Sequence, residues 1–214
     1  MSDIPPTTND SQLACKSSAL PTHAQNTLDT LLSRRSRWPL SDPGPSKTEL
    51  DTIFDVALRA PDNGLLRPWR FVVIQGDARD AFGDLLVDIS SAREPDWLQT
   101  EHAQRKQRAF AAPLIIALGV SVITRAPIPE VEQLLSVGAA AMNMLNAVHA
   151  LGYGGYWTSG PDCYEPELQE ALGLKDEDRL LGFLYIGTPC GALSDQERPL
   201  KSSHVREWGV PYES

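Results

Sequence analysis

Residues 129–160, PEVEQLLSVGAAAMNMLNAVHALGYGGYWTSG, decide the fold class of this chain. The part up to residue 151 is apolar on nearly every side, which predicts one long helix that is buried over most of its surface. Its small residues, Gly138 to Ala141, indicate that another backbone can approach the helix closely. The following YGGYWTSG predicts a strand that leads into a turn.

The glycines of this junction argue against a dinucleotide-binding loop. The pattern G-x-G-x-x-G would require glycine where Trp157 stands. Such a loop also follows a strand and opens a helix, whereas this one follows a helix and enters a strand. A Rossmann-type site is therefore not expected here.

The remaining periodicity places strands and helices in alternation. Apolar runs predict strands at residues 70–75, 113–123 and 180–189. Helical spacing predicts helices that begin near three polar residues, Asn26, Ser46 and Asp77, with Ser46 to Glu49 forming a capping box. A short helix is expected at 166–172, and residues 93–109 suggest a charged surface helix or lid. Helices interleaved with a few strands indicate an α+β or α/β fold.

Composition limits the classes of function. The chain has 214 residues, of which 42% are hydrophobic and 22% charged, as in ordinary globular proteins. Its net charge of −9 argues against nucleic acid or an anionic membrane surface as a partner. No apolar run approaches the ~20 residues of a membrane span, and the three cysteines form no C-x-x-C pair, which suits a reducing cytoplasm. We interpret residues 1–23 as a flexible leader without a secretory signal, and residues 24–214 as a single domain.

A basic cluster in this acidic chain has two interpretations. Arg34, Arg35, Ser36 and Arg37 occupy four consecutive positions after a leucine-containing helical run, and Pro39 follows. Cations are favoured at a helix C-terminus, so the cluster could be a solvated helix end. Alternatively, arginine forks beside a hydroxyl suit a phosphate. The sequence has no Walker, H-E-x-x-H or G-x-S-x-G pattern, so we name no metal ligand and no catalytic acid, base or nucleophile.

Four motifs in order resemble the nitroreductase family, and its short bacterial subgroup most closely. They are RRSRWPL (34–40), ALRAPDNGLLRPWRFVVI (57–74), ALGYGGYWTSG (150–160) and LLGFLYIGTP (180–189), and the resemblance covers about residues 26–210. It implies an FMN-dependent NAD(P)H oxidoreductase of α+β fold, with a central, mostly antiparallel sheet flanked by helices. It also implies a domain-entwined homodimer with the flavin at the subunit interface.

The resemblance assigns the basic cluster to the flavin phosphate. Arg34 and Ser36 would bind the phosphate, and Arg35 would reach the pyrimidine edge of the ring. Because this phosphate carries nearly two negative charges, charge-assisted bonds from arginine suit it. In the C-terminal tail, Arg198 or Lys201 would lie near the same phosphate, and the tail would lie across the partner subunit with four large side chains, Val205, Trp208, Val210 and Tyr212.

Two further segments would line the flavin ring. Arg59 and Asn63 match positions that contribute to the flavin, expected from the other chain. A second segment would lie along the isoalloxazine, with a backbone amide of Ser159 or Gly160 donating to flavin N5; it comprises Trp157, Thr158, Ser159 and Gly160. Trp157 also has a simpler interpretation as a packed core residue.

Two positions depart from the family pattern. Many relatives have Gln where Arg67 precedes Pro68, and subgroup members often have His at the position of Asn63. If Arg67 points at the ring, it would stabilise the anionic reduced flavin. If it points outward it is an ordinary surface charge, which is the interpretation we favour.

The resemblance implies ping-pong transfer of electrons from NADH or NADPH to nitroaromatic, quinone or similar small electrophiles. No ribose-reading residue identifies which nucleotide is used. Two alternatives stay open: another redox reaction on the same fold, such as oxidative dehydrogenation, dehalogenation or flavin breakdown, and a flavin-binding protein without turnover.

Overall fold

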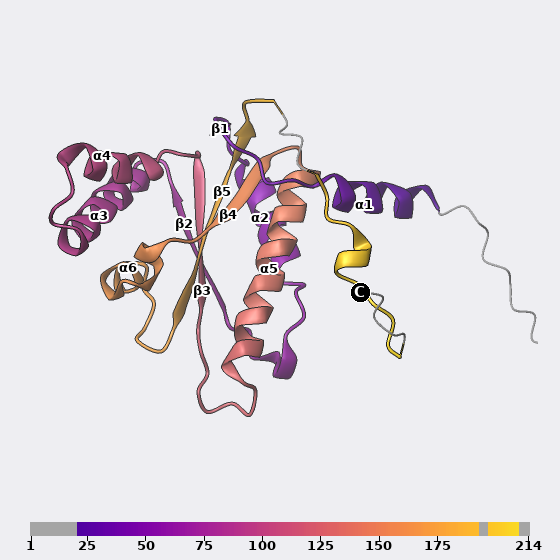
Figure 1. Ribbon diagram of the computed structural model, residues 1–214. Helices are drawn as coiled ribbons and strands as arrows, with labels where there is room; N and C mark the ends of the chain where they lie inside the picture. The colour runs from indigo at the N-terminus through magenta and orange to yellow at the C-terminus, as the bar shows by residue number, and fades with distance from the viewer. Residues whose placement is uncertain (1–20, 193–196, 210–214) are drawn as a thin grey trace, which may run out of the picture. The chain divides into compact units, whose positions relative to one another are not determined.

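The computed structural model describes residues 21–192 and 197–209 (Figure 1), and the chain divides into two compact units after Arg35. The described part of the first unit is helix α1 (Thr22–Ser33), which has no buried residue. Its N-cap is Pro21, so the cap predicted at Asn26 is wrong. Most of the predicted leader, together with Val210 and Tyr212, lies outside the described residues.

The second unit is built on one antiparallel sheet. Its path is β1-β5-β3-β2, and β4 also pairs with β5. Every pairing is antiparallel, which confirms the α+β class and the mostly antiparallel sheet. The strands are β1 (Leu40–Ser41), β2 (Trp69–Gln75), β3 (Leu114–Val120), β4 (Gly154–Thr158) and β5 (Arg179–Pro189).

Helices cover both faces of this sheet (Figure 1). The helices are α2 (Lys47–Ala57) and α5 (Glu130–Ala150) on one face, and α3 (Ala78–Arg93), α4 (Gln99–Arg108) and α6 (Pro166–Ala171) on the other. Each face has its own apolar cluster, one containing Ile53 and Met144 and the other containing Phe82 and Leu168. All seven residues of β3 are buried, as the unbroken apolar run predicts for a central strand.

The predicted helix start and capping box at Ser46 are confirmed. Asp77 also stands at the N-cap position of its helix, but it does not cap it through its side chain. The Glu49 carboxylate accepts from the Ser46 backbone N–H at 2.8 Å, and the Glu49 N–H donates to Ser46 Oγ at 3.4 Å. Hydrogen bonds from Ser46 and from the Tyr153 hydroxyl hold the pKa of Glu49 below its usual value. Asp77 precedes α3, but its side chain makes no capping hydrogen bond.

Helix α5 is buried or partly buried over most of its surface, as predicted, but one apolar stripe is exposed in the single chain. Val137, Met144 and Val148 are enclosed, but Val131, Leu135 and Met142 are 60%, 66% and 40% exposed. These three positions recur at helical spacing and form one apolar stripe. A side chain added at Gly138, between them, would meet nothing within 4 Å. Among the described helices, none is long and apolar enough to cross a bilayer.

A glycine in β5 allows the end of β4 to pack against it. Gly182 has φ +128°, a conformation that L side chains rarely adopt, and an added Cβ would collide with the Thr158 carbonyl oxygen. The same Cβ would lie 2.8 Å from Trp157 Nε1. The register between β3 and β5 also shifts here, between Ala117 and Gly119. Gly182 therefore sets the position of Thr158 and Trp157.

We expect Gly182→Ala to lower the free energy of unfolding by about 2–3 kcal/mol, because it adds a steric collision to an unfavourable φ. Gly152→Ala is the matched control, since Gly152 has φ +87° but open space around its added Cβ. That control should cost only about 1 kcal/mol. Urea unfolding followed by circular dichroism measures both, and equal losses would show that the Thr158 carbonyl moves aside without cost.

Candidate active site at the edge of strand β4

Strand β4 is paired on one side and open on the other. It pairs with β5, and the Gly155 carbonyl on its outer edge accepts a hydrogen bond from the Arg37 backbone N–H at 3.2 Å. Because backbone groups alternate along an antiparallel strand, those of Trp157 and Ser159 point toward the same outer edge. The stretch from Gly155 to Ser159 spans about 13 Å. This edge is the feature around which the candidate site is built.

The segment that follows Arg35 lies against the beginning of this edge. Besides its backbone contact, Arg37 donates from Nη2 to the Gly191 carbonyl at 3.2 Å, and Cys190 N–H donates to the Pro39 carbonyl at 3.1 Å. A Cβ at Gly154 would lie 2.9 Å from Arg37 Cβ, so glycine is required for this close approach. Ser36, exposed and next in the chain to Arg37, is held beside the edge. The sequence analysis gave Arg37 no role of its own, whereas the structure shows that it anchors the segment.

The other end of the edge presents backbone donors. In the described part of the chain, the N–H groups of Ser159 and Gly160 have no hydrogen-bond acceptor. Trp157 is 40% exposed and donates from Nε1 to the Leu181 carbonyl at 3.2 Å, so it is not a packed core residue. An open amide beside an exposed aromatic ring can donate to a flat ligand that carries hydrogen-bond acceptors.

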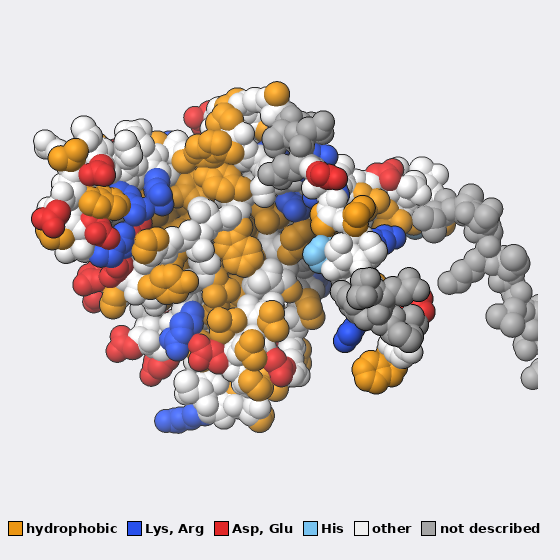
Figure 2. Space-filling model, viewed as in Figure 1, with side chains coloured by type: hydrophobic (Ala, Val, Ile, Leu, Met, Phe, Trp, Pro, Cys, Tyr) orange, Lys and Arg blue, Asp and Glu red, His pale blue; other side chains and the backbone are white. Residues whose placement is uncertain are grey.

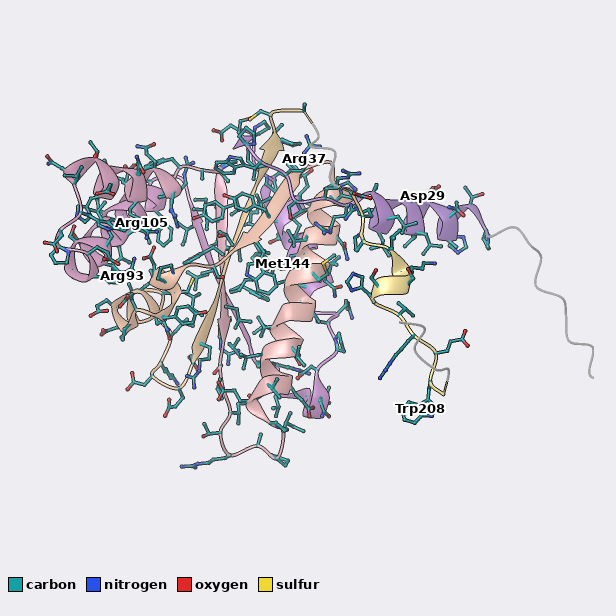
Figure 3. The ribbon with its side chains drawn as sticks, in the orientation of Figure 1. Asp29, Arg37, Arg93, Arg105, Met144 and Trp208 are labelled. Atoms are coloured by element: carbon teal, nitrogen blue, oxygen red, sulfur yellow. The ribbon has the colours of Figure 1, made fainter. Side chains whose placement is uncertain are left out.

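A buried carboxylate fixes the loop that follows these amides. Asp162 is 4% exposed and contacts Arg93 Nη1 at 2.7 Å and Arg105 Nη1 at 3.2 Å. Burial lowers the pKa of Arg105, and the attraction of Asp162 opposes that shift. Figure 3 labels Arg93 and Arg105 on the side of the sheet covered by α3 and α4. The loop is thereby tied to two helices.

Sequence reasoning missed this ion network because residues 93–109 were interpreted as a surface element. Arg105 is in fact 7% exposed, and its position in an otherwise polar helix carried no signal of burial. The neighbouring Cys163 is also buried, which raises the pKa of its thiol and favours a structural role over a reactive one.

The remaining predicted residues are distributed over other parts of the chain. Asn63 donates from Nδ2 to Glu132 Oε2 at 2.7 Å, and this bond ties it to α5 rather than to β4. Arg59 is exposed at the end of α2. Arg34 and Arg35 belong to the first unit, so their role stays a prediction. Within one chain, the second unit places Ser36 near one end of the outer edge of β4 and the segment from Trp157 to Gly160 at the other, whereas Asn63 is bound to α5.

Arg67 lies in a strained turn. Its φ is +51°, that of Leu65 is +54°, and Gly64 between α2 and β2 has +76°. The Asp62 carboxylate accepts from the Arg67 backbone N–H at 2.7 Å and holds the turn. The Arg67 residue itself is exposed, as expected for a surface charge. Non-glycine residues in this conformation cost free energy and are concentrated at functional sites.

The geometry above agrees with a comparison of the whole sequence. Residues 31–188 match the sequence model of the Nitroreductase family. The chain belongs to the nitroreductase family. YdjA of Escherichia coli K12, which carries the provisional name NAD(P)H nitroreductase, is 37% identical over 162 residues, covering 76% of this chain and 87% of YdjA. A Haemophilus influenzae protein with the same provisional name is 32% identical, covering 75% of this chain and 87% of that protein.

Solved structures of this nitroreductase family share the fold. A nitroreductase-like protein from Bacillus cereus superposes with a TM-score of 0.73 at 22% identity, covering 86% of this chain and 96% of that one. A provisionally named nitroreductase from Desulfovibrio desulfuricans, solved in complex with FMN, has a TM-score of 0.66 at 26% identity, covering 87% and 97%. The fold expected from the motifs is therefore confirmed.

We expect Asp162→Ala to destabilise the protein by about 3 kcal/mol, because it leaves two partly or fully buried arginines without their carboxylate. Asp84→Ala is the control: Asp84 pairs with Lys106 at 2.6 Å, but its side chain is 64% exposed. Such exposed pairs contribute little, so this variant should unfold like the parent protein. Urea midpoints of the two variants test this, and a stable Asp162→Ala protein would contradict the role given to the network.

Proposed function

We propose that this nitroreductase-family chain is an FMN-dependent NAD(P)H oxidoreductase. The observation that carries the proposal is the outer edge of β4, with Ser36 near one end and the unpaired amides of Ser159 and Gly160 at the other. An FMN molecule has the matching distribution of groups, because its ribityl chain separates an anionic phosphate from a flat ring rich in acceptors. YdjA, by its provisional name an NAD(P)H nitroreductase, supports the choice of electron donor.

The residues present fit such a ligand. Ser36 offers a hydroxyl donor, and Arg34 and Arg35 precede it directly, which suits a phosphate. The ring would lie along the segment from Trp157 to Gly160, where an amide of Ser159 or Gly160 would donate to flavin N5. The FMN complex of the Desulfovibrio desulfuricans relative supports this identification of the ligand.

Bound FMN would accept electrons from NADH or NADPH and pass them to an oxidised acceptor, such as a nitroaromatic or a quinone. The chain itself supplies position and polarity. The β4–β5 pairing, Gly182 and the Asp162 network hold the Ser159 and Gly160 amides in place, so that the donors need no reorganisation. We assign no side chain as a catalytic acid or base. A cytoplasmic location suits such an enzyme and remains a prediction.

We also propose a homodimer. The apolar stripe of Val131, Leu135 and Met142 on α5 would be covered by the partner, and Gly138 would permit a close helix crossing. In the tail, Leu200 and Val205 are each 70% exposed and Trp208 is 98% exposed, so the tail also offers apolar surface to a partner. Burial of each such side chain contributes roughly 1.5–3 kcal/mol. The partner would then supply Arg59 and Asn63 to the site.

The purified protein should be yellow and release about one FMN per chain on acid treatment, and the colour should bleach on anaerobic mixing with NADH or NADPH. Arg34→Ala should weaken FMN binding by about 1.5–3 kcal/mol, the scale of a charged hydrogen bond. Titration of the apoprotein with FMN measures this loss. Arg37→Ala is the comparison: it loses the bond to the Gly191 carbonyl, so thermal stability should fall more than flavin affinity.

Three results would redirect the proposal. Recovery of FAD, haem or no chromophore after reconstitution would exclude it. A yellow protein that neither nucleotide bleaches would support the flavin-binding protein without turnover. Bleaching without transfer to nitroaromatics or quinones would support a different redox reaction on the same fold.

Leu135→Glu should convert the dimer to a monomer, because it places a charge in the centre of the apolar stripe on α5. Leu98→Glu is the matched control, since Leu98 is 68% exposed at the start of α4, away from the stripe. Size-exclusion chromatography with light scattering measures the mass of each variant. A dimeric Leu135→Glu protein, or a parent protein that is monomeric and fully flavinated, would show that the stripe is not the interface.

A further inference from the structure

A cleft of about 390 Å³ opens beside the end of β4, and Arg105 and Arg108 of α4 form part of its lining. Figure 2 shows apolar side chains in the middle of this view, next to a region over α3 and α4 where basic and acidic side chains are mixed. The cleft shares residues 158–160 with the outer edge of β4 described above. The side chains that matter for its chemistry are Trp38, Tyr156, Tyr185, Arg105 and Arg108.

All the charged residues that line this cleft are arginines. No carboxylate is among its described lining residues, although the chain as a whole carries a net charge of −9. Arg105 already forms an ion pair with Asp162, with its Nη1 3.2 Å from Asp162 Oδ2. Arg108 is exposed, and its guanidinium makes no hydrogen bond or ion pair with any other residue that the structure describes. A Cβ on Gly160 would lie 3.8 Å from Arg108 Nη1, so this guanidinium lies next to the unpaired amide.

The walls of the cleft are aromatic. The rings of Tyr156 and Tyr185 stack with centroids 5.0 Å apart, and Trp38 meets Tyr156 edge-on at 5.2 Å. Burial raises the pKa of Tyr185 to about 12 and also raises that of Tyr156, so both phenols are neutral donors at neutral pH. Their hydroxyls have no hydrogen-bond partner among the described residues. The cleft thus combines flat apolar walls with donors that no acceptor in the described part of the chain satisfies.

We propose that this cleft binds planar aromatic acceptors that carry a carboxylate, and that Arg108 is the residue that selects for this charge. The inference rests on the proposed oxidoreductase function, because the cleft adjoins the segment assigned to the flavin. A guanidinium matches both oxygens of a carboxylate, and the aromatic ring of the ligand would pack against Trp38 and Tyr156. A neutral analogue would leave Arg108 without a counter-charge and would gain only the apolar contacts.

The test compares 4-nitrobenzoate with 4-nitrobenzamide, which has the same shape and no charge. Calorimetric titration of the oxidised full-length protein, as purified, measures binding without turnover, and initial rates with NADPH give kcat/KM for each acceptor. The parent protein should prefer the nitrobenzoate, and Arg108→Gln should reduce that preference about tenfold while leaving the affinity for the nitrobenzamide unchanged. Arg108→Lys should retain part of the preference. Arg125→Gln, which removes an exposed arginine outside the cleft lining, should behave like the parent.

Several outcomes would overturn the inference. They are equal binding of the two probes by the parent protein, equal loss of both probes in Arg108→Gln, and a similar loss in Arg125→Gln. If Arg108→Gln instead raises KM for NADPH but not for NADH, and the preference between the probes persists, the charge belongs to the nucleotide phosphate and the inference is wrong. If the titrations show the charge preference but no NADPH is oxidised, the proposed function fails while the cleft assignment stands.

Discussion

The arrangement of the candidate site depends on one constraint, the incomplete pairing of β4. β5 is long enough to pair with β3 along one side and with β4 and β1 along the other, so β4 becomes an edge strand. An edge strand exposes backbone donors and acceptors that would otherwise pair with another chain. Here the beginning of the edge is closed by the contact from Arg37 to Gly155, and the end is left open at Ser159 and Gly160. The open part is short, which suits a small ligand better than another strand.

The unpaired amides of Ser159 and Gly160 can bind a ligand only if their positions are fixed. Three independent contacts restrain them: pairing of Thr158 with Phe183, the indole bond from Trp157 to the Leu181 carbonyl, and the two arginines around Asp162. The last of these ties the loop to helices α3 and α4 through the side chains of Arg93 and Arg105. The buried ion network gives the loop a defined position but adds little to the free energy of unfolding, because burial of the charges is costly even when they are paired. Rigid backbone donors are what electrostatic stabilisation of a bound anionic ring requires.

Much of the fold and part of the candidate site could be predicted from the sequence. The features that could not be predicted depend on contacts between residues far apart in the chain. The apolar run of β3, the capping box at Ser46 and the small-residue helix α5 are local signals, and the structure confirms each element. The segment from Trp157 to Gly160 could be identified because the strand and its turn are continuous in the chain. The Asp162 network could not, because it joins residues more than fifty positions apart and Arg105 carries no local sign of burial. Nor could the anchoring role of Arg37, which depends on contacts with Gly155 and Gly191 that only the folded sheet brings near.

The distribution of the predicted residues is itself an argument for assembly. Asn63 is held by Glu132 at the start of α5, the helix that carries the apolar stripe, and Arg59 is exposed just after the end of α2. If α5 packs against α5 of a second copy, Asn63, which is bound to the start of α5, would lie near the partner subunit. The strained turn from Gly64 to Arg67 would then be a feature of the interface, where a surrounding structure can compensate for its unfavourable φ values. The same contact that buries Leu135 and Met142 would complete the site, so that flavin binding and dimer formation would stabilise one another.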